Sequence, residues 1–220
     1  TIVKVEKNAA GVIQGTTVFR PETAQLDVDD KRNLKLLNLC DPYVSEFFFG
    51  GKVIIVEGDT EYTAFNYIIA SNPEAYKDVH IIRARGKATI VSLIKILNHF
   101  GSSYSVLHDS DTPLTANGAM ANPAWGNNAN ILAAIVAKPA GTQTRLLASL
   151  PNFEQAYFGE VIATEKPYNA LLTITEQPAK FTIIETLLQS LINHNAAIPD
   201  NCDEWSTIDD LREKLEAVVA

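Results

Sequence analysis

The sequence predicts an α/β fold: a mostly parallel sheet flanked by helices, with an additional helical region after it. Short β-branched and apolar runs alternate with helical patterns between residues 53 and 108, in the order strand, helix, strand, helix, strand. Strands that alternate with helices in this order form a parallel sheet with right-handed crossover connections. With 220 residues, 46% of them hydrophobic and 20% charged, the chain is long enough to bury a core of this kind.

The segment from residue 52 to residue 61, K-V-I-I-V-E-G-D-T-E, predicts the first strand and the first helix of the sheet. Residues 53–56 are all apolar and β-branched, which is typical of a buried strand. Gly58 ends this strand, and apolar residues then recur at helical spacing as far as residue 69. We therefore expect Glu57 at the carboxyl end of a strand and Glu61 in the first turn of a helix.

The next part of the chain shows the same pattern of strands and helices, with carboxylates after a strand end. Residues 79–83 and 104–108 predict two further strands, and an amphipathic helix over residues 87–100 connects them. The last of these strands continues into V-L-H-D-S-D, so Asp109 and Asp111 follow its end. Because they are two residues apart, their side chains face the same way if the chain stays extended.

The remainder of the chain predicts a long loop, a fourth strand and several helices. Residues 112–130, rich in Pro, Asn, Gly and Ala, predict the loop, and residues 131–137 a short helix. Residues 145–150 predict the strand, whose end brings Glu154 to the edge of the sheet. Lys166 follows in a predicted loop. Helices are then expected near residues 168–175, 181–194 and 206–219.

Carboxylates gather after the predicted strand ends. In open α/β sheets the carboxyl ends of the strands form the ligand site. Like charges that converge there disfavour joint ionisation unless a cation neutralises them, and oxygen ligands suit Mg²⁺ or Mn²⁺. The sequence therefore predicts a divalent-metal site formed by Glu57, Glu61, Asp109, Asp111 and Glu154.

We divide the chain into three parts. Residues 1–50 form a lead-in, with a hairpin over residues 1–19 and a helix interrupted at Pro42; residues 51–166 form the central domain, with an insertion near 112–142; residues 167–220 form a carboxyl-terminal helical region. The sequence shows no membrane span and no signal-peptide pattern. Two distant cysteines, Cys40 and Cys202, favour a reducing, cytoplasmic setting.

A net charge of −8 argues against a protein that binds nucleic acid by simple electrostatics. Arg83, Arg85 and Lys87 nevertheless form a basic cluster at a predicted strand end, where they either contact phosphate or lie in a solvated loop. Gly86, between them, either lets the backbone approach the site closely or forms a plain turn.

These motifs resemble a known family. The E-G-D-T-E of residues 57–61, followed by D-S-D, resembles the TOPRIM fold, and within it the nuclease domain of the OLD (overcoming lysogenization defect) family. The F-F-F-G-G-K of residues 47–52, the R-G-K of residues 85–87, the P-N-F-E of residues 151–154 and the K-P of residues 166–167 also fit that family. The resemblance covers roughly residues 45–170.

The resemblance implies a metal-dependent DNA endonuclease or nickase that uses two Mg²⁺ or Mn²⁺ ions. Glu57, Asp109 and Asp111 would be catalytic metal ligands, and Glu61 and Glu154 would complete the two-ion site. Lys166 would stabilise charge on the phosphate in the transition state, or else it is a surface lysine. The implied partners are DNA, an ATPase domain on the amino-terminal side of a longer chain, and a helicase-type protein.

The main alternative is a TOPRIM-like module that binds DNA or a partner without catalysis. Five retained carboxylates argue against it, because an inactive site need not keep them. Other TOPRIM chemistries fit less well. A topoisomerase needs a nucleophilic tyrosine on a separate domain, and a primase usually brings a zinc-binding region that two distant cysteines cannot build.

Overall fold

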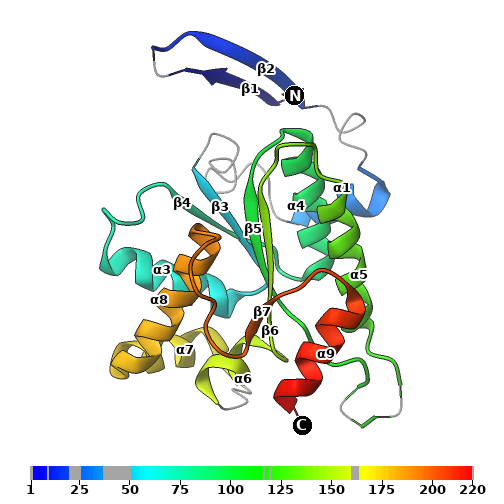
Figure 1. Ribbon diagram of the computed structural model, residues 1–220, viewed down its shortest axis with the longest axis vertical. Coiled ribbons are helices and arrows are strands. Elements are labelled where there is room, and N and C mark those ends of the chain that lie inside the picture. The colour runs from blue at the N-terminus through cyan, green and yellow to red at the C-terminus, as the bar shows by residue number, and fades with distance from the viewer. Residues whose placement is uncertain are drawn as a thin grey trace.

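The computed structural model describes most of the chain, and its centre is a five-stranded sheet (Figure 1). The strand order is β4-β3-β5-β6-β7. The strands are β3 (Lys52–Val56), β4 (Val79–Arg83), β5 (Tyr104–Asp109), β6 (Thr144–Ser149) and β7 (Cys202–Glu204). The described residues are 2–8, 10–19, 26–36, 51–115, 117–118, 120–159 and 164–219.

Four of the five strands are parallel, so the predicted mostly parallel α/β sheet is confirmed. β3 lies between β4 and β5, and β5 pairs with β6, all in parallel register. β7 is the exception, because it pairs antiparallel with the far side of β6. β7 was not among the predicted strands, since three residues, C-D-E, are too short to show a strand pattern.

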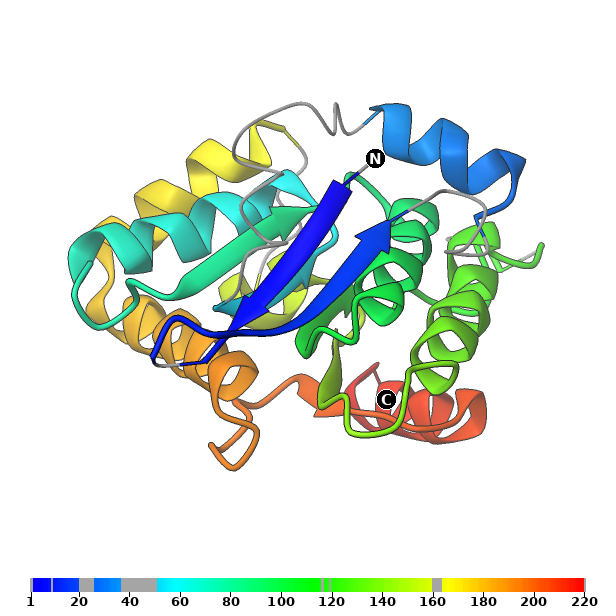
Figure 2. The same ribbon diagram turned by 90° about the horizontal axis from the view of Figure 1, so that it is seen from above.

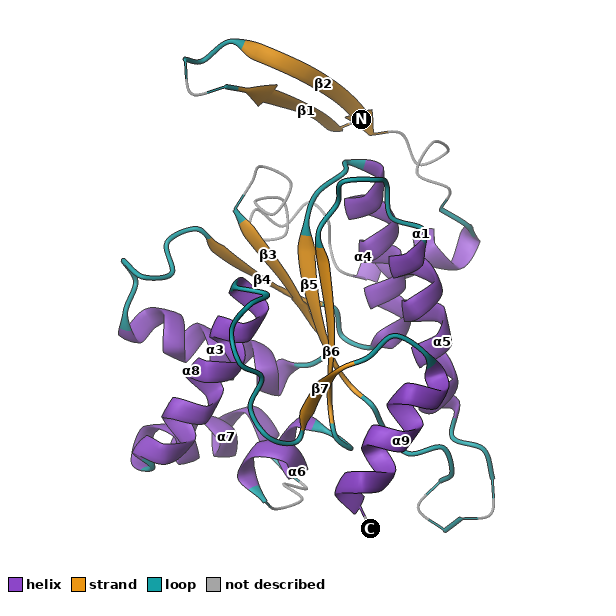
Figure 3. Cartoon of the chain, in the orientation of Figure 1, coloured by secondary structure: helices purple, strands orange, loops and turns teal. Residues whose placement is uncertain are grey.

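Helices cover both faces of the sheet (Figure 3). On one face lie α1 (Val28–Leu36), α4 (Lys87–His99), α5 (Pro123–Val136) and α9 (Ile208–Val219). On the other lie α3 (Asp59–Ser71), α6 (Phe153–Phe158), α7 (Lys166–Glu176) and α8 (Pro178–Ile192). Both faces of each central strand are therefore buried, which is why the strands read as continuous apolar runs.

The alternation of side chains along β3 divides the core into two layers. Val53 and Ile55 pack into the layer beneath α4, α5 and α9, whereas Ile54 and Val56 pack into the layer beneath α3, α7 and α8. The predicted carboxyl-terminal region contributes to both layers, through Ile184 and Leu187 on one side and Leu211 on the other. The strands are thus held rigidly, and their carboxyl ends have fixed positions.

Two predictions about local structure are wrong. The segment 112–130 is not a loop throughout, because α5 begins at Pro123, where the Asn122 side chain accepts a hydrogen bond from the Ala124 N–H. The helix buries Trp125 in the core, which outweighs the low helix propensity of its Asn and Gly residues. Lys166 is not in a loop either: it is the first residue of α7, with Pro167 in the helix's first turn.

The amino-terminal hairpin is confirmed. β1 (Ile2–Lys7) and β2 (Ile13–Phe19) form an antiparallel pair that crosses over the amino-terminal edge of the sheet (Figure 2). The predicted helix from residue 30 is seen as α1, but the predicted break at Pro42 lies outside the described residues. In the described part of the chain, no helix has both the length and the apolar character that a membrane crossing requires.

Replacing Gly126 by alanine should stabilise the protein by about 0.5–1 kcal/mol. Gly126 lies inside α5 on the exposed side, and a Cβ there meets no atom within 4 Å. The measurement is the urea midpoint of unfolding. Gly101→Ala is the matched control: it also has open space, but its φ of +60° is left-handed, so it should destabilise. A lower midpoint for Gly126→Ala would contradict the packing described for α5.

Candidate metal centre

Four carboxylates gather at the carboxyl edge of the sheet, as the strand order dictates. Glu57 directly follows β3, and Asp109 is the last residue of β5. Glu61 lies in the first turn of α3, and Glu154 in the first turn of α6, which follows β6. β3, β5 and β6 are neighbours in the sheet, so their ends are adjacent and the helices that follow them begin at one place.

Short hydrogen bonds fix the relative positions of these side chains. The Asp109 backbone N–H donates to Glu57 Oε2 at 3.2 Å, and the Phe153 N–H donates to Asp109 Oδ1 at 2.8 Å. The Thr60 hydroxyl donates to Glu154 Oε1 at 2.9 Å. Glu57 and Asp109 therefore lie within reach of a single ion cluster.

Burial and mutual repulsion act on these carboxyl groups together. Removal from water, and after it the charges of Glu57 and Glu154, raise the pKa of Glu61 to about 8. The pKa values of Glu57 and Asp109 are also raised, again first by burial and then by the neighbouring carboxylates. A cation at this edge would reverse these shifts, because it compensates both causes.

Asp111 lies beside the cluster, but in a different conformation from the expected one. The chain does not stay extended after Asp109: Asp111 has a φ of +57°, in the left-handed region. Its carboxylate forms an ion pair with Lys87. It still lies close enough to Glu57 for its charge to raise the pKa of that residue.

The set of side chains fits a divalent ion by its chemistry. Within the described residues, no three His, Cys, Asp or Glu side chains are already arranged as metal ligands. The carboxylates instead accept hydrogen bonds from protein donors, which a bound ion would have to replace. The candidate ligands are all carboxylate oxygens, the type of ligand that Mg²⁺ or Mn²⁺ prefers. A Cβ on Gly58 would lie 3.0 Å from Glu61 Oε2, so this glycine leaves room for the carboxylate.

The predicted basic residues have different surroundings. Lys166 reaches the cluster, with its Nζ 3.6 Å from Glu154 Oε1. Arg83 forms an ion pair with Asp59 at 2.7 Å and lies over the ring of Tyr62.

Lys87 and Arg85, the two cations on either side of Gly86, differ in burial. Lys87 is buried beneath the site, so neither of the two expectations for it, a phosphate contact or a solvated loop, is met, whereas Arg85 is exposed. Gly86 has a φ of +116°, and its N–H donates to the Glu57 carbonyl at 3.0 Å. The loop after β4 thus contacts the backbone of the first carboxylate.

His108 supports Asp109 from the opposite face of β5. It is fully buried, and Trp205 Nε1 donates to its Nε2 at 3.2 Å. Because the indole is only a donor, Nε2 must accept and Nδ1 carries the proton, which it donates to the Asp109 carbonyl at 2.7 Å. Burial lowers the pKa of His108 to about 3, so the ring stays neutral. No local pattern predicts the Trp205 partner, which is 97 residues away along the chain.

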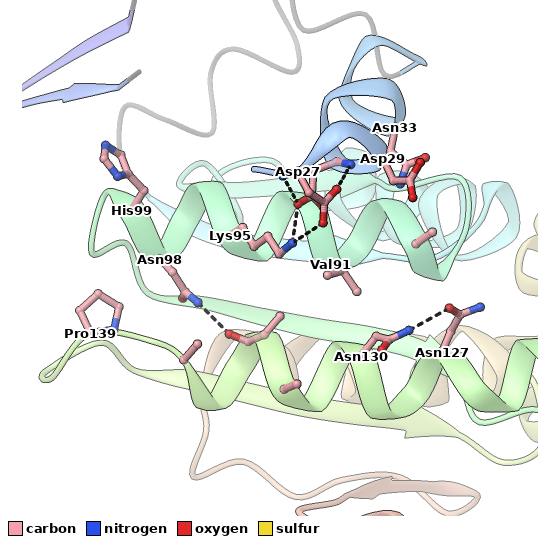
Figure 4. Close-up of a pocket in the computed structure, with 15 residues that line it drawn as sticks. Asp27, Asp29, Asn33, Val91, Lys95, Asn98, His99, Asn127, Asn130 and Pro139 are labelled. Carbon is pink, nitrogen blue, oxygen red and sulfur yellow. Dashed lines mark hydrogen bonds and ion pairs between the residues drawn. The ribbon is translucent and has the colours of Figure 1, made fainter. Parts of the chain in front are cut away.

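A cavity of about 710 Å³ lies elsewhere, between α1, α4 and α5 (Figure 4). Asp27, Asp29 and Lys95 line it, together with several asparagines. Asp30 anchors α1 beside it through Ser92 Oγ at 2.7 Å and through Lys95. None of the five predicted carboxylates lines this cavity, so it is not the predicted site.

Comparison with known families agrees with the resemblance. Residues 48–111 match the family model described as "Overcoming lysogenization defect protein-like, TOPRIM domain". The match includes Glu57, Glu61, Asp109 and Asp111 and ends before Glu154 and Lys166. No curated protein matches the chain.

The stability of the metal-free protein should fall as the pH rises from 6.5 to 8. In this window unfolded Glu61 is ionised, whereas folded Glu61, with a pKa of about 8, still holds its proton. The folded state therefore binds more protons, and each extra proton costs at most about 1.4 kcal/mol of stability per pH unit. His108 opposes this slope near pH 6.5, because the unfolded ring still binds part of a proton there and the folded ring binds none, so the fall in stability should be clearest between pH 7 and 8.

The measurement is urea unfolding in EDTA at several pH values. Glu61→Gln should flatten the slope, while Glu176→Gln, at the exposed end of α7, should leave it unchanged. Equal slopes for wild type and Glu61→Gln would show that Glu61 is not crowded by the other carboxylates.

Proposed function

Because residues 48–111 form a TOPRIM domain of the OLD family, we propose that this chain is a divalent-metal-dependent DNA endonuclease or nickase. One observation carries the proposal: carboxylates from the ends of β3, β5 and β6 meet in a single buried cluster, at the edge where α/β sheets bind ligands. Burying several carboxylates together without a cation opposes folding, which is difficult to explain for a purely structural cluster.

Glu57, Glu61, Asp109, Asp111 and Glu154 are the residues that would hold the ions, Mg²⁺ or Mn²⁺, two in number. When bound, such ions supply an activated water and stabilise the leaving oxygen of a phosphodiester. The protein orients the ligands: the Phe153 N–H holds Asp109, and the Thr60 hydroxyl holds Glu154. These contacts leave the carboxylates few rotamers, as a catalytic site requires.

Lys166 is the residue that would stabilise charge on the scissile phosphate. Its side chain is 47% exposed and lies beside Glu154, so its ammonium can turn from that carboxylate toward a substrate. Arg83 is the last residue of β4 and Arg85 follows the strand, on the same edge, and both would contact the DNA backbone nearby. Gly86 keeps the loop that carries Arg85 close to Glu57.

We further propose that the chain works with partners. A net charge of −8 provides little attraction for DNA, so bound ions and a basic surface elsewhere would supply it. An ATPase domain preceding residues 1–50 and a helicase-type protein are the partners we propose, in a cytoplasmic setting. The TOPRIM catalytic domain would span residues 51–166, with residues 167–220 as its helical extension.

A non-catalytic binding module is the second candidate, and one observation favours it. The carboxylates already have protein hydrogen-bond donors, and no ready ligand set is present among the described residues. Metal binding separates the two proposals, because a binding module has no need of an ion at this edge.

Plasmid DNA incubated with the protein should be nicked or cut in Mn²⁺ or Mg²⁺ without any nucleotide. Asp109→Asn keeps the acceptor for the Phe153 N–H but removes a charged ligand, so calorimetric Mn²⁺ binding and nicking should fall together. Nicking that persists in EDTA, or that requires ATP, would refute the proposal. DNA binding with neither Mn²⁺ binding nor cleavage would favour the binding module.

Lys166→Ala should lower nicking by about 10²-fold and leave Mn²⁺ affinity unchanged, because it removes charge stabilisation but no ligand. Lys166→Arg should restore little, since a planar guanidinium places its charge differently. Lys52→Ala, an exposed lysine at the opposite edge of the sheet, is the control for nonspecific loss of positive charge. Wild-type nicking by Lys166→Ala would mean that this lysine is only a surface residue.

A further inference from the structure

Lys87 is a buried cation enclosed by three acceptors. It is the first residue of α4, and its side chain is 3% exposed. Its Nζ pairs with Asp111 Oδ2 and donates to the carbonyls of Ser110, at 3.4 Å, and Ala124, at 3.2 Å. These three acceptors match the three protons of an ammonium group. The amine therefore has no proton left for a substrate phosphate, and no path to one.

The segment that Lys87 holds is a strained turn. Asp111 is not a glycine, yet it has a φ of +57°, in the left-handed region that a residue with a Cβ seldom adopts. Its N–H donates to the Pro151 carbonyl at 2.8 Å, and Ser110 Oγ contacts the same carbonyl at 3.2 Å. The loop after β6 thus supports the turn from one side.

Asn128 supports the turn from α5. Its side chain is fully buried, and its Nδ2 donates to the Ser110 carbonyl at 2.8 Å, the same oxygen that Lys87 contacts. Two donors from two helices therefore converge on the peptide that precedes Asp111. Such convergence fixes the direction in which the Asp111 side chain leaves the backbone.

We propose that Lys87 is a positioning residue that holds Asp111 on this turn, so that its carboxylate faces the cluster of Glu57 and Asp109. The inference rests on the proposed metal-dependent function. It gives Lys87 a role other than the phosphate contact or the solvated loop that the sequence left open. The ion pair uses Oδ2 of Asp111, so Oδ1 of the same carboxylate is the oxygen that would serve as a ligand.

Lys87 has two opposite effects on a cation at this site. Its charge repels the ion, so removing it would strengthen binding if charge alone mattered. Its contacts hold Asp111, so removing it would weaken binding if positioning dominates. The Asp111 side chain is 28% exposed, and without Lys87 it can rotate into water. We therefore expect positioning to dominate, and the sign of the change in affinity tests this directly.

The experiment measures Mn²⁺ affinity by calorimetry for wild type, Lys87→Met and Lys87→Arg. Lys87→Met should weaken Mn²⁺ binding about 10–100-fold, the usual effect of losing a partner that orients a ligand. Lys87→Arg keeps the charge but cannot place it at the same point, so it should weaken binding about 10-fold. If Lys87→Met does not fold, Lys87→Arg decides the question alone.

Lys95→Met is the matched control. Lys95 lies two turns further along α4 and also pairs with a buried aspartate, Asp30, but on the side away from the site. It should lower the melting temperature and leave Mn²⁺ affinity unchanged. A weaker affinity in Lys87→Met alone therefore reports on the metal site rather than on general stability.

The double variant Lys87→Met with Asp111→Asn tests the route of the effect. If Lys87 acts through Asp111, the pair should bind Mn²⁺ no more weakly than Asp111→Asn alone. Wild-type or tighter affinity in both Lys87 variants would overturn the inference, as would a fully additive loss in the pair. A wild-type protein that binds no Mn²⁺ would instead refute the proposed function.

Discussion

The repulsion among buried carboxylates is the constraint on which this structure depends. Glu57, Glu61, Asp109 and Glu154 come from segments up to 97 residues apart, yet they share one edge of the sheet, and burial raises the pKa of the first three. Helix dipoles offset part of this cost, because Glu61 and Glu154 lie in the first turns of α3 and α6, where partial positive charge is found. Lys87 and Lys166 offset another part. The rest must come from bound protons or bound cations.

The architecture explains why these groups meet. Parallel strands end at the same edge, so residues that follow β3, β5 and β6 become neighbours without any sequence proximity. The two apolar layers on either side keep those ends from shifting. Asp109 is the best supported of the four: the Phe153 N–H holds its carboxylate, and His108, fixed by Trp205, holds its carbonyl. A rigid scaffold of this kind lets a few side chains remain in an unfavourable electrostatic state.

Much of the fold and part of the site could be predicted from the sequence. The apolar runs before Glu57 and Asp109 predicted buried parallel strands, and the carboxylates after them predicted an acidic edge, because both features are local. The predictions that failed concern residues whose structure depends on contacts with residues distant in the sequence. The burial of Trp125 makes residues 123–130 helical, and pairing with β6 makes residues 202–204 a strand. Lys87 looked like a surface cation beside Arg85, since nothing local shows that Asp111, Ser110 and Ala124 enclose it.

The short strand β7 has a consequence for the order in which the protein is made. It covers the outer side of β6, Cys202 packs into one core layer, and Trp205, one residue after the strand, packs into the other and reaches His108 behind the acidic edge. These residues leave the ribosome after all of the carboxylates. During synthesis, β6 therefore remains an unpaired edge strand until this segment emerges. An unpaired edge strand can form hydrogen bonds with other nascent chains. The acidic edge acquires its final rigidity only when this late segment has docked.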